Sequence, residues 1–517
     1  MKKIISTLAC ISLLLVSCNE DDRMIAQTSS PAEVSGLYPQ PPSLWLGGDQ
    51  PYYSSGYTGD VMPYFDNGKF HLFFLHDAKN KPAGEGFHDI HEFETNDLVH
   101  FDYTGRMIPY GLQNKADFAV GTGSVVKVGS EYYFYYTGHN GNSAWTGAHP
   151  RESVLLAKST DLSKWTKVDN FIITAPAGYN NFEFRDPHVF HNDEDGKYWM
   201  LVSTQASPNN RAVILKFTSE DPASGSWTPA GPLYTSGAAE NYLMMECADI
   251  FQMGQTWYLV FSENWSNAKG THYRMASSPD GPWSKPVNDM LDGEYFYAGK
   301  TATDGNKRYL FAWTARRSGE TDAGNKEYAG NLVTHELIQN TDGTLGVKVP
   351  ETVASGFGQA TTPSAVTKLG AVNENASAFE LDGTASPAVV LFPELGKTNH
   401  IHTSITLNEA AADAGFVFGA QDMSAGYYKV IFEPQNGRIA GYTQAGGNTS
   451  EVTRVPFTFE AGHTYQIDIV TDNSVCVVYI DGKAALSNRI YTLRGQNWGF
   501  MAQNATATFG VPQIRVH

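Results

Sequence analysis

Charged side chains are scarce in this sequence. Asp, Glu, Lys and Arg make up 17% of its 517 residues, and the acidic excess gives a formal net charge of −18. An acidic surface repels nucleic acid phosphates and anionic lipid headgroups, so we expect no nucleic acid partner and no charge-driven membrane binding. At 41% hydrophobic residues the chain is also too apolar to be disordered.

Cysteines are few. The chain has Cys10, Cys18, Cys247 and Cys476, with no Cys-x-x-Cys pair among them. The last two are far apart in the sequence. We therefore predict neither a disulfide framework nor a thiolate metal site.

Long apolar runs are missing apart from residues 4–16, which follow two lysines. This run is too short to span a bilayer and is typical of a signal peptide, placed at residues 1–18. It ends Leu-Val-Ser-Cys, which resembles a lipoprotein cleavage site and implies lipidation of Cys18. An ordinary secretory signal is the alternative. The acidic run after Cys18 resembles the surface-export signals of Bacteroidota lipoproteins.

These features predict an exported protein whose lipid holds it to the outer membrane, at the cell surface or facing the periplasm. Residues 19–40 would form the tether. The membrane contact is expected through the lipid alone.

Helix-length periodic segments are missing too, and a strand pattern recurs instead. A turn, an aromatic residue and alternating large apolar residues return at intervals of 52–66 residues, anchored at Phe70, Tyr132, Tyr198, Trp257 and Tyr309. A second motif, at 95–101 and 159–165 with looser copies ending at Trp227 and Trp283, has the same period. Five small sheets in series predict an all-β fold, with a five-bladed β-propeller over residues 41–352.

The composition and the residue pattern of the sequence change after the repeats. Residues 353–376 are rich in Ala, Ser, Thr and Gly, and we expect a linker there. Residues 377–517 hold short alternating runs without the sixty-residue repeat. About 140 residues of this kind suit a β-sandwich.

The repeat places three carboxylates at one position. Asp60, Asp186 and Glu246 lie 10, 12 and 11 residues before the aromatic anchors of their units. The first strand of a propeller blade lines the central channel, so these side chains should converge there. Crowded carboxylates raise one pKa and keep one group protonated, as glycosidic cleavage requires. For each acid alone, a turn cap or a bond between blades is the alternative.

Several motifs around these acids occur in one order along the repeat. They are Gly59–Phe65 followed by Phe70–Phe74, Gly121–Ser124, Arg185-Asp186-Pro187, Glu246-Cys247, Phe296–Thr301, and Gly330–Val333 with Pro350. Together they resemble glycoside hydrolase family 32, the β-fructosidases. The resemblance covers residues 41–352, and the sandwich resembles the lectin-like module of that family, which binds fructan in some members and only packs on the propeller in others.

The resemblance implies a role for each site residue. Asp60 would be the nucleophile, Glu246 the general acid and then base, and Asp186 the transition-state stabiliser, with Arg185 holding the carboxylates and the sugar. Retention is then expected, with the Asp60 and Glu246 carboxyls about 5–5.5 Å apart. Cys247 would tune Glu246, or be a small buried hydrophobe. No metal and no cofactor are implied.

The nucleophile segment departs from the family pattern Trp-Met-Asn-Asp-Pro-Asn-Gly. Here Gly59 precedes Asp60 and Val61 follows it. Gly121 stands where the family has an aromatic residue, and Ala248 stands where it has proline. These changes lie where the terminal sugar would be gripped, so the substrate stays open.

Further residues are candidates for sugar contacts, with packing between blades as the alternative. They are Thr122 and Ser124 in the second unit, and Trp145, His149, Trp265 and Tyr297 as stacking surfaces. The group His71, His76, Asp77, His88, Asp89 and His91 lacks a recognised ligand spacing, so no metal site is predicted.

The sequence thus predicts a retaining hydrolase of β-fructosidic bonds, with a carbohydrate substrate such as a fructan or fructo-oligosaccharide and with surface glycan-uptake proteins as candidate partners. The alternatives are an arabinan- or xylan-type propeller glycosidase, a non-catalytic surface glycan-binding protein, and a structural cell-surface protein.

Overall fold

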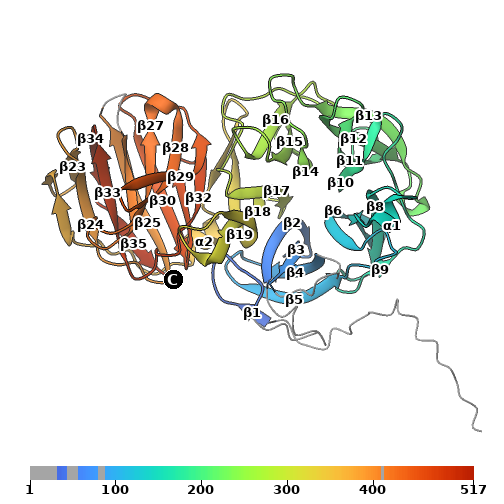
Figure 1. The fold of residues 1–517 in the computed structure, drawn as a ribbon, viewed down its shortest axis with the longest axis horizontal. Coiled ribbons are helices and arrows are strands. Elements are labelled where there is room, and N and C mark those ends of the chain that lie inside the picture. Colours follow the sequence, from blue (N-terminus) through green and yellow to red (C-terminus); the bar gives the residue numbers. More distant parts are fainter. Residues whose placement is uncertain (1–31, 43–55, 80–87, 409–412) are drawn as a thin grey trace, which may run out of the picture.

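The computed structural model describes residues 32–42, 56–79, 88–408 and 413–517. Cys18 and the predicted signal segment lie outside these ranges. The described chain forms two β-rich bodies side by side, a ring of sheets and a pair of stacked sheets (Figure 1). Its helices are short: α1 (Ser143–Thr146), α2 (Glu351–Ser355), and the 3-10 turns η2 (Pro222–Ser224), η3 (Ser318–Glu320) and η4 (Pro434–Asn436).

The ring is a β-propeller. Within the described ranges its antiparallel strands fall into five consecutive groups, which we call blades 1 to 5. Blade 1 is β2 (Gly56–Asp66), β3 (Lys69–Ala78), β4 (Asp89–Thr95) and β5 (Phe101–Ile108), and blade 2 is β6 (Ala119–Val128), β7 (Glu131–His139), β8 (Glu152–Ser159) and β9 (Thr166–Lys167). Blade 3 is β10 (Tyr179–Asn192), β11 (Lys197–Ala206), β12 (Arg211–Ser219) and β13 (Thr228–Thr235). Blade 4 is β14 (Glu246–Met253), β15 (Thr256–Glu263) and β16 (Gly270–Ala276), and blade 5 is β17 (Phe296–Thr303), β18 (Arg308–Arg317) and β19 (Lys326–Gln339), with β20 (Leu345–Lys348) paired to β19.

Residues of the two sequence motifs pack against one another between neighbouring blades. The aromatic anchors begin the second strand of each blade. In the second motif, Asp161 accepts backbone N–H bonds from Ser163 and Lys164, and this turn brings Trp165 onto the sheet. Trp165 packs edge-to-face on Phe73 and Phe134, with ring centroids 5.8 and 5.2 Å away. Such contacts between blades explain why both motifs share one period.

The ring closes between its first and last blades. Gly330 of β19 pairs with Thr58 of β2, which joins blades 1 and 5 into one hydrogen-bonded sheet. The short strand β1 (Ala32–Val34) covers the outer edge of this sheet by pairing with β5. The segment predicted as a tether therefore contains a strand.

The second body is a β-sandwich. One sheet has the order β21 (Thr367–Leu369), β24 (Ala388–Phe392), β33 (Asn497–Gln503), β26 (Asp413–Ala420), β27 (Tyr427–Glu433), β28 (Arg438–Ala445), β29 (Asn448–Pro456). The other has β22 (Ala371–Glu374), β23 (Ala378–Asp382), β34 (Thr506–Gly510), β25 (Thr398–Leu407), β30 (Thr464–Asp472), β31 (Val475–Ile480), β32 (Ala484–Arg489), with β35 (Gln513–Val516) on β25. Phe500 and Phe509 stack across the shared core at 4.5 Å.

The segment 353–376, expected to be a linker, differs from that expectation. It contains β21 and β22, which pair with β24 and β23 and form sheet edges. Both strands are short and largely exposed, so they lack the apolar alternation by which a strand is recognised in a sequence.

The sandwich shares buried contacts with the propeller. Val470 and Val477 lie in one apolar cluster with Leu310 of blade 5. Buried polar groups cross the same interface, among them Asp292, which accepts hydrogen bonds from the Ser487 backbone N–H and hydroxyl at 2.7 and 2.6 Å. Burial with satisfied hydrogen bonds holds the two bodies together.

Within the described residues, Cys247 and Cys476 are both buried and have free thiols. Over the same ranges, no helix is long and apolar enough to cross a membrane.

Candidate active site

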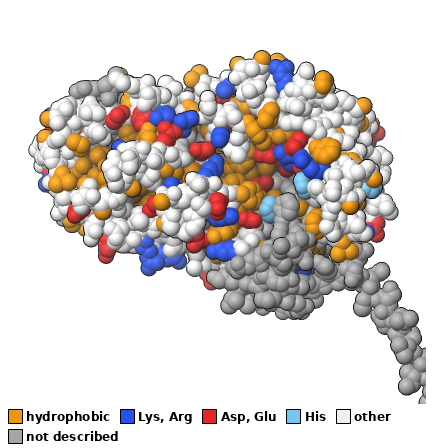
Figure 2. All heavy atoms as spheres, viewed as in Figure 1, with side chains coloured by type: hydrophobic (Ala, Val, Ile, Leu, Met, Phe, Trp, Pro, Cys, Tyr) orange, Lys and Arg blue, Asp and Glu red, His pale blue; other side chains and the backbone are white. Residues whose placement is uncertain are grey.

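The inner strand of every blade carries an irregularity in its pairing at the same level of the ring. The register shifts between Thr58 and Val61, Gly121 and Gly123, Arg185 and His188, Glu246 and Asp249, and Tyr297 and Lys300. A β-bulge bends its strand and turns a side chain out of the sheet's alternation. These bulges bring the predicted acids of blades 1, 3 and 4 together at the axis, where Figure 2 shows a hollow with acidic and basic side chains.

Asp60 is held through both carboxylate oxygens. The Thr122 hydroxyl donates to Oδ2 at 2.7 Å, and the Trp313 indole N–H donates to Oδ1 at 2.8 Å. Burial raises the pKa of Asp60, these two hydrogen bonds oppose the rise, and the charge of Glu246 adds to it. The carboxylate is thus kept in one orientation by donors from blades 2 and 5.

Glu246 opens β14 and is also held on both oxygens. The Arg185 guanidinium donates to Oε1 at 2.8 Å, and the Tyr297 hydroxyl donates to Oε2 at 2.6 Å. Its side chain is 20% exposed, whereas the residue Asp186 is 3% exposed. Glu246 can therefore exchange protons with a bound ligand or with water.

Asp186 lies at the bulge of β10, with a left-handed φ of 61°. The backbone N–H of Cys247 donates to its Oδ2 at 2.9 Å, and its own N–H donates to the Thr137 hydroxyl at 2.8 Å. Burial raises the pKa of Asp186 to about 7; Arg185 opposes the rise, and the charges of Glu246 and Asp60 add to it. Near neutral pH this carboxyl exists in both protonation states.

Arg185 joins the carboxylates of three segments. Besides Glu246 it contacts Glu183 and donates to Glu152 of β8 at 3.0 Å. Although burial disfavours charge on Glu152, hydrogen bonds from His139 and the charge of Arg185 lower its pKa to about 2. The arginine is thus fixed by carboxylates on one side while it presents its other edge to Glu246.

The Cys247 thiol lies between the acids. Its Sγ is 3.8 Å from Asp60 Oδ2, 3.8 Å from Asp186 Oδ2 and 3.9 Å from the Thr122 hydroxyl. Burial and the neighbouring negative charges raise the pKa of Cys247 well above its ordinary value. The group is a neutral thiol that separates two carboxylates and carries no charge of its own.

The other predicted contact residues divide into two sets. Thr122 and Tyr297 reach the carboxylates directly, as described above. Ser124 lies below them, where its hydroxyl accepts the Val189 N–H at 2.8 Å and ties blade 2 to blade 3.

The two predicted tryptophans lie on loops at the same end of the ring as the carboxylates. Trp145 is in α1, stacked on His149 at 4.1 Å, and Trp265 follows β15 and is 40% exposed. Their suggested sugar contacts remain predictions.

Sequence reasoning missed Trp313 and Tyr328. Trp313 lies in β18, the strand that the aromatic anchor Tyr309 begins, and its indole reaches Asp60. The repeat gave no sign of Trp313. Thr137, Ser203 and Ser262 pair with the start of the bulge in blades 2, 3 and 4 and lie five residues after their aromatic anchors, but the same count in blade 5 reaches Thr314. Only the pairing of Tyr297 with Trp313 in the structure places the tryptophan at that position.

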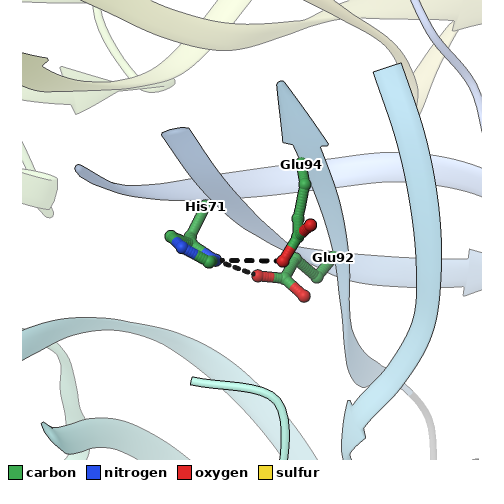
Figure 3. A group of neighbouring side chains, drawn as sticks. All are labelled: His71, Glu92 and Glu94. Atoms are coloured by element: carbon green, nitrogen blue, oxygen red, sulfur yellow. Dashed lines mark hydrogen bonds and ion pairs between the residues drawn. The ribbon is translucent and has the colours of Figure 1, made fainter. Parts of the chain in front are cut away.

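One group of potential metal ligands lies apart from the axis, on β3 and β4 (Figure 3). His71 Nδ1 lies 2.7 Å from Glu92 Oε1 and 3.5 Å from Glu94 Oε1. Thr104 also donates to Glu92, and Lys69 pairs with Glu94, both at 2.6 Å. These polar groups satisfy one another, so a structural hydrogen-bond network accounts for the cluster.

Comparison with known proteins identifies related chains. Residues 60–345 match the model for the glycosyl hydrolases family 32 N-terminal domain, and residues 343–515 match the GH32, BT1760-like, C-terminal domain. A raffinose invertase of Escherichia coli is 30% identical over 298 residues, which are 54% of this chain and 59% of that protein. A levanbiose-producing levanase of Bacillus subtilis is 24% identical over 460 residues, 83% of this chain and 82% of that protein.

The overall fold also occurs among solved structures. The sucrose-6-phosphate hydrolase of Lactobacillus gasseri superposes with a TM-score of 0.70 at 17% identity, covering 93% of each chain. At this identity the likeness concerns the fold, a propeller followed by a sandwich.

Proposed function

Because this chain belongs to glycosyl hydrolase family 32, we propose that it is a retaining hydrolase of β-fructosidic bonds in fructans or fructo-oligosaccharides. The observation that carries the proposal is the arrangement of Asp60 and Glu246. Each carboxyl is oriented by two donors, and the charge of Glu246 acts on Asp60 and raises its pKa.

In the proposed first step, Asp60 attacks the anomeric carbon of the fructosyl unit while Glu246 protonates the departing glycosidic oxygen. The C–O bond to the leaving sugar breaks as the bond to Asp60 forms. Glu246 then takes a proton from water, which attacks the same carbon and releases Asp60. Two displacements on one carbon return its original configuration.

Asp186 is proposed to stabilise the transition state by hydrogen bonding to the hydroxyls of the fructosyl ring. Its carboxyl is buried beside both reacting groups and is fixed by the Cys247 N–H. A bond that strengthens as positive charge develops on the sugar lowers the barrier more than it tightens ground-state binding.

The named relatives support a fructosyl-containing substrate. The matched proteins are called a raffinose invertase and a levanase, and the second alignment includes the sandwich as well as the propeller. Because the residues around Asp60 differ from the family pattern, the preferred linkage and chain length are to be measured.

Product analysis tests this proposal. The purified protein is incubated with sucrose, inulin, levan and arabinan, beside a Glu246→Ala variant. Free fructose or fructo-oligosaccharides that are absent with the variant support the proposal, and NMR of the first-formed anomer reports retention. Release of arabinose would favour an arabinan-type glycosidase, and no release from any glycan would favour a binding protein.

We also propose that the protein is exported and anchored by a lipid on Cys18. The support is the run of residues 4–16 ending in Leu-Val-Ser-Cys, outside the described residues. Fatty acid labelling in cells that is lost in Cys18→Ser tests this anchor. Labelling that persists in that variant would contradict it.

A further inference from the structure

An irregularity in blade 5 brings an unassigned side chain to the nucleophile. Along β18 and β19, Ala315 pairs with Gly330 and Arg316 with Glu327, so Tyr328 and Ala329 form a bulge. Ala329 has a left-handed φ of 63°, which is uncommon for a residue with a side chain. The bulge places the Tyr328 hydroxyl 3.4 Å from the backbone nitrogen of Asp60, which donates to it.

The space that this hydroxyl occupies exists because residue 59 is glycine. A Cβ at Gly59 would lie 2.3 Å from the Tyr328 hydroxyl oxygen and 2.9 Å from the Leu75 carbonyl oxygen. Both contacts are shorter than van der Waals separation allows. Glycine at position 59 and tyrosine at position 328 therefore depend on each other. Gly59 has no side chain, and the Tyr328 hydroxyl takes that space and places a polar group beside Asp60.

The ring of Tyr328 is held from two sides. It packs edge-to-face on Trp313 with centroids 5.1 Å apart, and it stacks on His88 at 5.2 Å. Trp313 itself donates to Asp60, so tryptophan and tyrosine form one rigid unit against the carboxylate. The guanidinium of Arg316 also contacts the Tyr328 carbonyl and fastens the bulge from behind.

We propose that Tyr328 is a positioning residue for Asp60, and that its hydroxyl, in the space left by Gly59, accepts the Asp60 N–H and so orients the nucleophile. This inference rests on the proposed role of Asp60. It adds a residue from the closing strand of the propeller to the donors Thr122 and Trp313.

Removal of the Tyr328 hydroxyl should raise the pKa of Asp60. A hydrogen bond from the Tyr328 hydroxyl lowers the pKa of Asp60, in opposition to the larger effect of burial. The other titratable or charged groups near Asp60 or Tyr328 are Glu246, Asp186, Cys247, Tyr297, Asp77, His88 and Arg316, with Arg185 bound to Glu246. Because attack requires ionised Asp60, loss of the hydroxyl should move the acid limb of the kcat/KM profile to higher pH.

The test compares Tyr328→Phe with the unaltered protein on a substrate that it cleaves. We expect kcat/KM at the optimum to fall about 10- to 100-fold, as for loss of a hydrogen bond to a charged group. We expect the acid limb to rise by about one pH unit, and most of the loss to appear in kcat. Tyr295→Phe is the matched control, because it removes a buried phenol hydroxyl from the apolar cluster on which Tyr328 packs, and within the described residues Tyr295 makes no hydrogen bond to Asp60.

Gly59→Ala provides a second, independent variant. Its added methyl group should displace the hydroxyl and move the acid limb in the same direction as Tyr328→Phe. An acid limb that stays in place in Tyr328→Phe, or that moves equally in Tyr295→Phe, would overturn the inference. Asp60→Asn tests the proposed nucleophile separately from Tyr328. Activity that survives Asp60→Asn refutes the proposed nucleophile. If Asp60→Asn is inactive but the acid limb of Tyr328→Phe stays in place, only the role of Tyr328 is refuted.

Discussion

At the scale of single residues, the burial of ionisable side chains at this site lowers the stability of the fold. Asp186 is an ionisable side chain buried beside two further carboxylates, and burial raises its pKa to about 7. Placing a charge there costs free energy that a neutral side chain of the same shape would not lose. Functional sites are often less stable than the fold could make them for this reason.

We therefore predict that Asp186→Asn stabilises the protein at alkaline pH while it abolishes hydrolysis. A carboxyl whose pKa is raised on folding contributes stability below its unfolded pKa of about 4, and loses it as pH rises through about 7. Asparagine does not ionise, so the variant should exceed the parent by about 1–3 kcal/mol at pH 8 and by little at pH 4. Denaturant unfolding at both pH values measures the difference.

The control for this prediction is Asp193→Asn, whose side chain is 96% exposed. It should show no such growth of the stability difference with pH. A gap for Asp186→Asn that is the same at pH 4 and pH 8 would contradict the explanation.

At the scale of elements, the bulges of the inner strands depend on side chains of the next strand. The Thr137 hydroxyl on β7 donates to the Thr122 carbonyl at 2.9 Å and accepts the Asp186 N–H at 2.8 Å. In blade 4 the Ser262 hydroxyl similarly accepts the Ala298 N–H at 3.1 Å. One hydroxyl thus ties the bulges of two neighbouring blades and sets the separation of Thr122 and Asp186.

Thr137→Val should loosen this connection without leaving a cavity. Valine matches threonine in shape but has no hydroxyl, so the buried Asp186 N–H and Thr122 carbonyl lose a partner. We expect the free energy of unfolding to fall by about 1–3 kcal/mol, and kcat to fall at least tenfold. Thermal denaturation and steady-state kinetics measure the two effects. Thr137→Ser keeps the hydroxyl and should retain most of the activity; losses in Thr137→Ser with an unaffected Thr137→Val would point to methyl packing instead.

At the scale of the whole molecule, a buried arginine of the sandwich contacts blade 5 of the propeller. Arg489 of β32 donates to the carbonyls of Thr314 and Ala315 at 3.1 Å each, and to Asn331 Oδ1 at 2.8 Å. These carbonyls directly follow Trp313, whose indole holds Asp60. The C-terminal body is therefore continuous with the support of the active site.

We predict that Arg489→Met, a change that keeps an apolar stem but removes the donors, destabilises the molecule by about 3–5 kcal/mol. Buried carbonyls of blade 5 would lose their partners, so activity should decline at temperatures where the parent is still folded. Arg454→Met is the control, since Arg454 also crosses to the propeller, at the Asn267 carbonyl, but from an exposed position. Calorimetry should show a large shift of the transition for Arg489→Met only, and similar shifts for both would argue against a special role of Arg489.

The sequence by itself determined the repeat, the all-β class and the positions of the three carboxylates. These features follow from local patterns: strand alternation, turn residues and a period near sixty place Asp60, Asp186 and Glu246 on the inner strands without knowledge of any long-range contact. The edge strands β21 and β22 were not predicted, because exposed strands lack apolar alternation.

Only the tertiary structure decided what surrounds the carboxylates. Trp313 and Tyr328 come from strands more than 250 residues after Asp60, and their reach depends on register shifts at bulges that no local pattern encodes. Arg489 comes from the other body of the protein. Hydrogen-bond partners, burial and pKa values are properties of three-dimensional proximity, and ring closure between blades 1 and 5 creates that proximity here.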